Sequence, residues 1–354
     1  MLFKNIKKYK KKIALLSNDP EKKITFEQIH KEYQKLKKKV KERKLVLLIA
    51  DNNIGNLLHY IILLKNNCIV QLVEAKTNFN EIQNLIKLYK PNLICSDNNW
   101  FKKNQKKYYK KKIFQSFNST IYETSFKNHK IHKDLSILMP TSGSMGSKKY
   151  VRISKKNIFE NTKSIISYLK LNKKDRSITS MPFCYSYMLS VINSHIEIGA
   201  SIFVTSETIV QKNFWSILNI NKITNFNGVP YHYEILLKFK LNKIFNKNIK
   251  FLTQAGGKLD STKSKLIIKF CKKNNINFFK MYGQTEASPR MSFIKITNYL
   301  DKIDSIGKAI PGGRLELIDK NNKKITKSNK IGELIYKGKN VCIGYAFNYK
   351  DLLK

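Results

Sequence analysis

The run of residues 141–151, Thr-Ser-Gly-Ser-Met-Gly-Ser-Lys-Lys-Tyr-Val, has the composition of an anion-binding turn. It lies between two short apolar runs, residues 135–139 and 150–153, which both predict β-strands. A turn of small residues points backbone N–H groups into one concavity, and such a concavity suits phosphate oxygens. The chemistry that this turn predicts is phosphate binding.

The individual side chains of the turn fit the same interpretation. Its glycines let the backbone approach an anion without a Cβ in the way, its hydroxyls can donate hydrogen bonds, and its second lysine adds positive charge. A plain polar hairpin turn remains the alternative, because no Gly-Lys-Ser/Thr opens a helix here as it does in a P-loop. The residues expected to contact phosphate are Thr141, Ser142, Gly143, Ser144, Gly146 and Lys149.

Five further segments downstream carry glycine, tyrosine, threonine or glutamate close to predicted strands. Ligands of open α/β sheets bind at the carboxyl ends of the strands, so these segments are candidates for one site. They are Asn227-Gly228-Val229-Pro230, residues 254–259 (Gln-Ala-Gly-Gly-Lys-Leu), residues 281–286 (Met-Tyr-Gly-Gln-Thr-Glu), residues 305–312, and residues 332–335 followed by Gly344-Tyr345.

The elements that position these segments follow an alternating pattern. Apolar runs at 45–50, 68–73 and 92–96 predict strands, and the longer runs at 54–66 and 80–89 between them predict helices. Such alternation predicts an α/β fold with parallel strands and crossover helices. We expect a first α/β subdomain at 1–135, a second at 136–300 with the nucleotide-binding motifs, and a small β subdomain at 301–354. The lysine-rich stretch 102–133 interrupts the pattern and is expected to be a surface excursion.

Composition limits the classes of function. The chain has 354 residues, 42% of them hydrophobic, and a formal net charge of +44. The basic excess is nearly all lysine, with arginine at only five positions, and it is spread over the whole chain. Because base-reading proteins favour the bidentate geometry of arginine, we expect no specific nucleic-acid binding. No apolar stretch is long enough to span a bilayer, so no membrane span is expected.

The cysteines indicate a reducing compartment. The five cysteines are widely spaced, and no Cys-x-x-Cys pair occurs. Scattered thiols in apolar segments are typical of buried free cysteines in the cytoplasm, and a zinc site is not expected. The basic N-terminus lacks the apolar core of a secretory signal.

In their order and spacing, the six segments resemble the adenylate-forming (AMP-binding) superfamily, which includes acyl-CoA synthetases and the adenylation domains of peptide synthetases. The motifs lie between residues 139 and 345. The resemblance implies the large N-terminal domain of these enzymes, with two stacked parallel-sheet α/β subdomains plus a small β subdomain. It also implies that ATP activates a small carboxylic acid as its acyl-adenylate. The acyl group would then pass to a thiol, either on coenzyme A or on the phosphopantetheine of an acyl carrier protein.

The resemblance assigns roles by position. The loop from Ser142 to Lys149 is similar to the loop that grips the β- and γ-phosphates of ATP. Gly256 and Gly257 fall where the family's backbone lines the adenine pocket. Tyr282, which Gly283 follows, matches the ring that stacks on adenine. Thr285 matches the hydroxyl on the α-phosphate, and Glu286, together with Ser144, matches the Mg²⁺ ligands. Lys149, Thr285 and Glu286 are the expected catalytic residues. A carboxylate beside a triphosphate requires a divalent cation, in agreement with this assignment.

The acyl side of the site is implied less specifically. Residues 182–187 (Pro-Phe-Cys-Tyr-Ser-Tyr) look like the family's acyl-side segment, although Tyr185 stands where many members have histidine. The substrate-binding candidates are Tyr185, Tyr187, Val229, Thr253 and Ala255.

Each role has a structural alternative. Tyr282 could be a core aromatic residue, Glu286 a residue favoured by a helix N-terminus, and Gly228-Val229-Pro230 a segment that only sets the shape of the backbone. Tyr185 and Tyr187 could fill a wall between helices, and His195 and His232 are expected to be structural.

The chain departs from the family pattern in two places. Met145, Lys148 and Tyr150 replace a threonine, a proline and a glycine of the phosphate loop, and one lost hydroxyl would cost about 1–3 kcal/mol. The family's next motif, hinge and C-terminal lid domain have no counterpart before Lys354. We therefore expect slow adenylation by this chain alone, or a need for a separate C-terminal domain. The alternatives are a nucleotide- or acyl-binding remnant without turnover and a basic nucleic-acid-associated protein.

Overall fold

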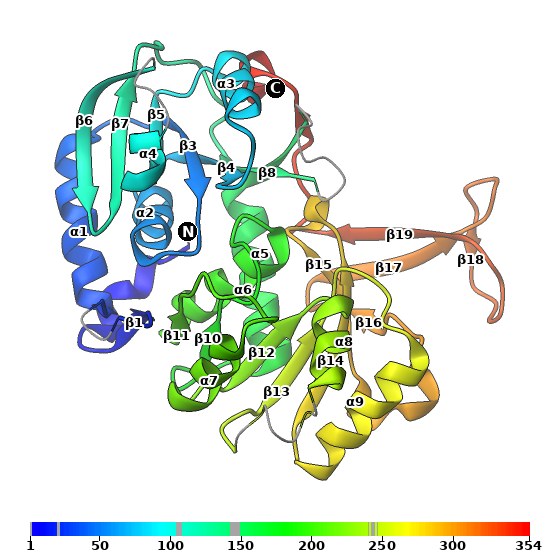
Figure 1. Ribbon diagram of the computed structural model, residues 1–354. Helices are drawn as coiled ribbons and strands as arrows, with labels where there is room; N and C mark the ends of the chain where they lie inside the picture. Colours follow the sequence, from blue (N-terminus) through cyan, green and yellow to red (C-terminus); the bar gives the residue numbers. More distant parts are fainter. Residues whose placement is uncertain are drawn as a thin grey trace.

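The computed structural model describes residues 2–19, 22–103, 108–141, 149–239, 241, 245 and 247–354. Within these residues the strands form sheets of eight, five, four and three strands. Figure 1 shows that the eight-stranded and five-stranded sheets lie in separate lobes, with helices α5 and α6 between them. The helices and sheets thus form the α/β architecture that the alternating pattern predicts.

The eight-stranded sheet has a parallel centre made of buried apolar runs. Its order is β20-β9-β8-β4-β3-β5-β7-β6, and β8, β4, β3 and β5 run parallel. Buried Val, Ile and Leu on both faces are typical of parallel strands that helices cover. The strands are β3 (Leu45–Ala50), β4 (Ile69–Glu74), β5 (Leu93–Asp97), β6 (Tyr109–Ser116), β7 (Ser119–Thr124), β8 (Leu135–Pro140), β9 (Tyr150–Ser154) and β20 (Tyr345–Ala346); their helices are α1 (Phe26–Lys39), α2 (Ile54–Lys65), α3 (Phe79–Tyr89) and α4 (Asn98–Lys103).

One expectation about this sheet is wrong. The stretch 102–133 is not a surface excursion, because β6 and β7 form a hairpin that extends the sheet antiparallel to β5. Lys110, Lys111 and Lys112 lie exposed on β6, the outermost strand. Lysine side chains on an edge strand discourage pairing with other chains, and here they mask the strand pattern in the sequence.

The second lobe holds the five-stranded sheet, in which β12, β13 and β14 are parallel and β15 and β16 are antiparallel. A four-stranded sheet beside it has the order β10-β11-β1-β2, in which β1, near the N-terminus, pairs with β11 and β11 pairs with β10, both in parallel. The strands are β12 (Asn225–Gly228), β13 (Phe251–Gln254), β14 (Asn277–Gly283), β15 (Arg290–Lys295), β16 (Lys308–Ala309), β10 (Arg176–Ile178), β11 (Ser201–Phe203), β1 (Ile13–Leu16) and β2 (Ile24–Thr25); the helices are α7 (Lys212–Ile220), α8 (Pro230–Lys238) and α9 (Ser261–Lys273).

Helices α5 (Lys155–Leu169) and α6 (Ser186–Glu197) join the two lobes. Residues of both helices belong to one hydrophobic cluster that includes Val46 of β3 and Phe279 of β14. Ser154 caps α5 and shares a capping box with Asn157, which fixes where the helix begins. The side-chain amide of Asn157 also donates to the carbonyl oxygens of Lys339 and Val341, at 2.8 and 2.6 Å, so the start of α5 is bound to the chain after β19.

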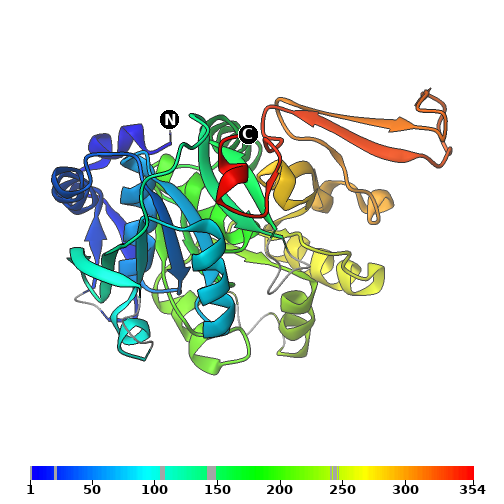
Figure 2. The ribbon, with the colours of Figure 1, turned by 90° about the horizontal axis from the view of Figure 1, so that it is seen from above.

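The three-stranded sheet projects from the body as a long arm (Figure 2). It consists of β17 (Gly313–Ile318), β18 (Lys324–Ile325) and β19 (Glu333–Gly338), all antiparallel. The chain then returns to the eight-stranded sheet as β20, which pairs with β9. Among the described residues no helix combines the length and the apolar character needed to cross a membrane.

The sheets do not follow the expected subdomain boundaries. Strands β8 and β9 lie beyond residue 135 but pair within the first sheet, and β1 pairs with strands near residue 200. The three strands of the small sheet all lie after residue 300. How the chain divides into folding units stays a prediction.

We predict that Gly283→Ala destabilises the fold. A Cβ at Gly283 would collide with the carbonyl oxygen of Pro289, which accepts a hydrogen bond from the Gln284 N–H at 3.0 Å. Because backbone cannot move aside as a side chain can, the expected loss in free energy of unfolding is about 3 kcal/mol. Urea unfolding monitored by circular dichroism measures it.

Gly312→Ala is the matched control. Gly312 has a left-handed φ of 85° but nothing lies within 4 Å of its missing Cβ. This variant should lose only about 1–2 kcal/mol, the conformational cost of the left-handed region. Equal losses in unfolding free energy for the two variants would contradict the prediction, because the backbone near Gly283 would then have moved to avoid the collision.

Candidate functional site

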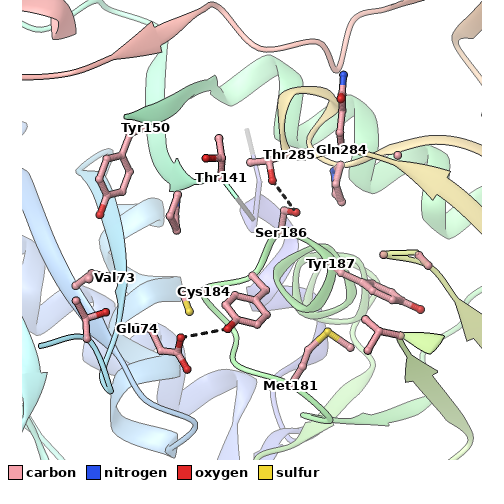
Figure 3. A pocket seen from close by; sticks show the side chains of 18 of the residues that line it. Val73, Glu74, Thr141, Tyr150, Met181, Cys184, Ser186, Tyr187, Gln284 and Thr285 are labelled. Atoms are coloured by element: carbon pink, nitrogen blue, oxygen red, sulfur yellow. Dashed lines mark hydrogen bonds between the residues drawn. The ribbon is translucent and has the colours of Figure 1, made fainter. Parts of the chain in front are cut away.

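A cavity of about 380 Å³ lies where the two lobes meet. Its wall combines the end of β4, the residue after β8, the segment that leads into α6, and the turn between β14 and β15 (Figure 3). These are carboxyl ends of parallel strands and the loops after them, the usual ligand position in an open α/β sheet. The cavity is the candidate active site.

The turn between β14 and β15 is held in place by two buried asparagines. The side-chain amide of Asn340 donates to the carbonyl oxygens of Ala287 and Arg290, at 2.5 and 2.9 Å. The amide of Asn161, on α5, donates to the same two oxygens at 3.4 and 3.1 Å. Buried carbonyls require such donors, so these contacts fix the backbone that carries Thr285 and Glu286.

Thr285 faces the cavity from this turn. It is 8% exposed, and its hydroxyl shares a hydrogen bond of 3.2 Å with the hydroxyl of Ser186, at the start of α6. Thr141, which follows β8, lines the same cavity (Figure 3). Thr141, the first residue of the predicted phosphate-binding turn, and Thr285, the expected α-phosphate contact, therefore line the same cavity.

Tyr345 links Lys149 and Glu286. The ammonium of Lys149 lies 3.7 Å from the centre of the Tyr345 ring, while the Tyr345 hydroxyl donates to Glu286 Oε1 at 3.0 Å. Burial raises the pKa of Tyr345, and the hydrogen bond and negative charge of Glu286 raise it further. The tyrosine therefore stays a neutral donor at neutral pH.

Lys149, Glu286 and Tyr345 are not part of the cavity lining, but a second tyrosine–carboxylate pair is. The Tyr185 hydroxyl donates to Glu74 Oε2 at 3.1 Å, and both residues line the cavity (Figure 3). Burial and the charge of Glu74 raise the pKa of Tyr185 to about 12, so the phenol remains protonated at neutral pH. Tyr185 is 42% exposed and is therefore not packing that fills a wall between helices.

Tyr187 connects the cavity to a buried polar network. Its hydroxyl is 2.7 Å from Thr253 Oγ1 and donates to the Thr253 carbonyl oxygen at 2.9 Å. Thr253 Oγ1 donates to Asn227 Oδ1, at 2.6 Å, and Asn227 in turn donates to Asn225. Tyr187 lines the cavity, whereas Thr253 is fully buried behind it. Of these two substrate-binding candidates, Tyr187 alone faces the space.

His195 ends this network and is structural in its contacts. Its Nδ1 lies 2.8 Å from the Val191 carbonyl oxygen, so this nitrogen carries the hydrogen and Nε2 accepts from the Asn225 amide at 3.0 Å. Burial lowers the pKa of His195 to about 4. His232, on α8, is also buried, and its pKa is lowered to about 4.

The remaining candidates divide into those inside and those beside the cavity. Val229, Ala255, Gly256 and Gly283 line it, and Gly256 has a left-handed φ of 77°. Gly257 and Tyr282 are not part of the lining. Tyr282 is 41% exposed, so it is not a core aromatic residue and presents its ring outside the hydrophobic clusters. The other loop candidates, Ser142, Gly143, Ser144 and Gly146, lie outside the described residues.

Two cavity residues, Glu74 and Arg290, were not expected from the sequence, and Ser186 was expected only as a member of the acyl-side segment 182–187. Ser186 and Glu74 hydrogen-bond to predicted site residues, and Arg290 lines the cavity beneath Tyr187. Each contact joins segments about 100 residues apart in the chain, which no local pattern reveals. One signal was available for Arg290, since it is one of five arginines in a chain that otherwise uses lysine.

Comparisons with known proteins show which family the chain resembles in sequence and in fold. The sequence model described as AMP-binding enzyme matches residues 2–346. The chain is 24% identical over 217 residues to 2-succinylbenzoate–CoA ligase of Listeria innocua, which covers 61% of this chain and 43% of that protein. It is 27% identical over 248 residues to oxalate–CoA ligase of Saccharomyces cerevisiae, which covers 68% of this chain and 44% of that protein. The matches thus span less than half the length of these relatives.

A solved structure is similar over almost the whole chain. O-succinylbenzoate coenzyme A synthetase from Bacillus subtilis, in complex with ATP and magnesium ion, matches with a TM-score of 0.73. The sequence identity is 16%, and the match covers 96% of this chain and 70% of that one. The two chains share a fold.

We predict that His195 contributes to acid sensitivity. Its folded pKa of about 4 lies below the ordinary value of 6.5, so the unfolded chain takes up this proton first as the pH falls. The stability that depends on neutral His195 is complete above the ordinary value and is lost as the pH falls towards the folded value. In His195→Gln, the loss in unfolding free energy between about pH 7 and about pH 4.5 should be about 2 kcal/mol smaller than in the parent.

Urea unfolding at the two pH values measures this difference. His132→Gln is the control, because His132 is a half-buried histidine of the segment before β8 and, within the described residues, makes no contact with the hydrogen-bond network of His195. An unaltered pH dependence in His195→Gln would contradict the prediction.

Proposed function

Because the chain belongs to the AMP-binding enzyme family, we propose that it activates a small carboxylic acid as its acyl-adenylate with ATP. Its fold is that of the N-terminal domain of adenylate-forming enzymes. The relatives reported above are named as coenzyme A ligases, which supports transfer of the acyl group to a thiol in a second step.

The proposed reaction has two steps. A carboxylate oxygen of the acid attacks the α-phosphorus of ATP, the bond from that phosphorus to the bridging oxygen breaks, and pyrophosphate leaves. A thiolate sulfur then attacks the acyl carbon, and AMP leaves with the electron pair of the broken C–O bond. Coenzyme A is the acceptor that the relatives' names favour, and the phosphopantetheine of a carrier protein is the second candidate.

The single observation that supports this function most strongly is the shared cavity of Thr141 and Thr285. Thr141 opens the glycine-rich loop, and Thr285 is the expected α-phosphate contact. On the nucleotide side, Lys149 and Glu286 both contact Tyr345. We propose Lys149, Thr285 and Glu286 as catalytic residues, with Lys149 stabilising the negative charge that shifts to pyrophosphate.

Magnesium fits the donor set of this site. Among the described residues no group of three or more His, Cys, Asp or Glu side chains gathers as a metal site. Mg²⁺ commonly needs only one or two carboxylates together with substrate phosphates, and Glu286 offers one, oriented by Tyr345. Glu286 would therefore hold the ion jointly with phosphate oxygens, and the ion would neutralise the triphosphate.

We propose the cytoplasm as the compartment. All five cysteines are free, and four of them are buried. Free thiols of this kind persist under reducing conditions.

We predict that Lys149→Ala and Glu286→Ala each weaken Mg·ATP binding by about tenfold or more, because each removes a charged contact. Isothermal titration of the full chain with Mg·ATP gives the dissociation constants. Lys156→Ala on α5 and Glu333→Ala on β19 are matched controls, since both side chains are exposed on other elements. Parent-like binding by both site variants would refute the site assignment.

The reaction itself is tested by pyrophosphate exchange. Labelled pyrophosphate should enter ATP only when a suitable carboxylic acid is present, and Thr285→Val should lower this exchange by about 100-fold, as expected for a lost transition-state donor. Nucleotide binding without acid-dependent exchange, over a broad panel of acids, would favour a binding protein without turnover.

A further inference from the structure

Arg290 is a buried cation on the wall of the cavity. It is 3% exposed, follows the turn between β14 and β15, and lines the cavity together with Tyr187. The guanidinium carbon lies 4.0 Å from the centre of the Tyr187 ring, and one terminal nitrogen donates to Ser190 Oγ at 3.1 Å. The ring and the hydroxyl hold the guanidinium plane in a fixed orientation.

The charge of Arg290 has no partner of opposite sign among the described residues. None of the ion pairs formed by the described residues involves Arg290, and the Nε of Arg290 is buried without a hydrogen-bond acceptor. The Ser190 hydroxyl is a neutral acceptor, and its own hydrogen is donated to the Tyr187 carbonyl oxygen at 2.6 Å. A buried charge without compensation is costly, and the cost falls when an anion binds beside it.

The other four arginines have acceptors that Arg290 lacks, although Nε of Arg43 and of Arg152 is also buried without a hydrogen-bond partner. Arg314 pairs with Glu316 at 2.7 Å. Arg43, Arg152 and Arg176 each donate to backbone carbonyl oxygens. Arg290 is thus the arginine that, within the described residues, has neither a carboxylate nor a carbonyl acceptor, and it is also the one that lines the cavity.

The two carboxylates on the cavity wall, Glu74 and Glu81, do not pair with the charge of Arg290. Glu74 is engaged by the Tyr185 hydroxyl, and neither Glu74 nor Glu81 forms a described ion pair with Arg290. The Tyr187 ring contacts Arg290, and Val229 and Ala255, which also line the cavity, add methyl groups and no charge. A ligand that reaches Arg290 must therefore bring its own negative charge.

We propose that the cavity selects carboxylic acids that carry a second carboxylate, and that Arg290 binds this second carboxylate while the first one reacts. The inference rests on the proposed function and names its substrate class. A planar guanidinium matches a carboxylate with two parallel N–H···O bonds, a geometry that lysine cannot reproduce. Arg290 then acts as a specificity-determining residue, and Tyr187 and Ser190 are its positioning residues.

The test compares acids that differ by one carboxylate. Full-length chain with Mg²⁺ and a non-hydrolysable ATP analogue is titrated calorimetrically with matched pairs: succinate against butyrate, glutarate against pentanoate, adipate against hexanoate, and phthalate against benzoate. In the parent, at least one dicarboxylate should bind about 30-fold or more tightly than its partner acid, as expected when a buried charge gains its counter-ion. In Arg290→Met, the two acids of that pair should bind within about threefold of each other.

Two further variants separate recognition from structure. Arg290→Lys keeps the charge and should retain part of the preference, which a merely structural arginine would not explain. Arg176→Met makes the same substitution at an arginine outside the cavity lining and should keep the full preference. Cooperative thermal unfolding of each variant confirms that it is folded.

The outcomes separate this inference from the proposed function. Equal binding of both acids in every pair, with ATP analogue bound and acid-dependent pyrophosphate exchange present, overturns the role of Arg290 and leaves adenylation standing. A preference that survives in Arg290→Met also overturns it. Failure of all eight acids to bind overturns the inference, and pyrophosphate exchange on a wider panel then decides separately about the proposed function.

Discussion

Four hydrogen bonds from two buried asparagines hold the turn between β14 and β15, and the site depends on this turn. Asn161 comes from α5 and Asn340 from the segment after β19, so the turn is fixed from two independent elements. From it, Thr285 reaches Ser186, Glu286 reaches Tyr345, and Arg290 reaches Tyr187. Buried carbonyls without donors are costly, so displacement of either asparagine would release all three side chains together.

The charges of the site are arranged by tyrosines. In a chain with 68 basic and 24 acidic residues, a carboxylate usually has lysine near it, as Glu316 does on the small sheet. Glu74, on the cavity wall, and Glu286, next to the lining residue Thr285, instead accept hydrogen bonds from Tyr185 and Tyr345. A phenol orients a carboxylate without neutralising it, whereas an ammonium in contact would cancel its charge. The negative charge of Glu286 therefore stays available for a divalent cation, and Lys149 is held on the face of the same ring.

The sequence predicts the elements of the first lobe well, because β3 and α2 are continuous apolar runs whose burial depends on no distant partner. The predicted strand 45–50 agrees with β3 to the residue. The hairpin β6–β7 escaped prediction because exposed lysines on its outer strand carry no apolar alternation. In the site, Thr141, Gly256 and Thr285 followed from the motif resemblance, and all three line the cavity. Arg290 and the contact of Ser186 with Thr285 did not follow from it, because both depend on how α6 packs against the turn.

The scarcity of arginine makes each arginine informative. Lysine suffices wherever the chain needs only solvated charge, since its ammonium is strongly hydrated and its stem can reach water. A guanidinium is less costly to bury and presents several N–H donors in one plane, so it suits fixed acceptors inside the fold. Arg43 and Arg176 illustrate this, because each donates to a backbone carbonyl oxygen of a segment distant in the sequence. Arg290 has the same buried, oriented plane but faces a space, so the acceptors that its geometry requires belong to a ligand.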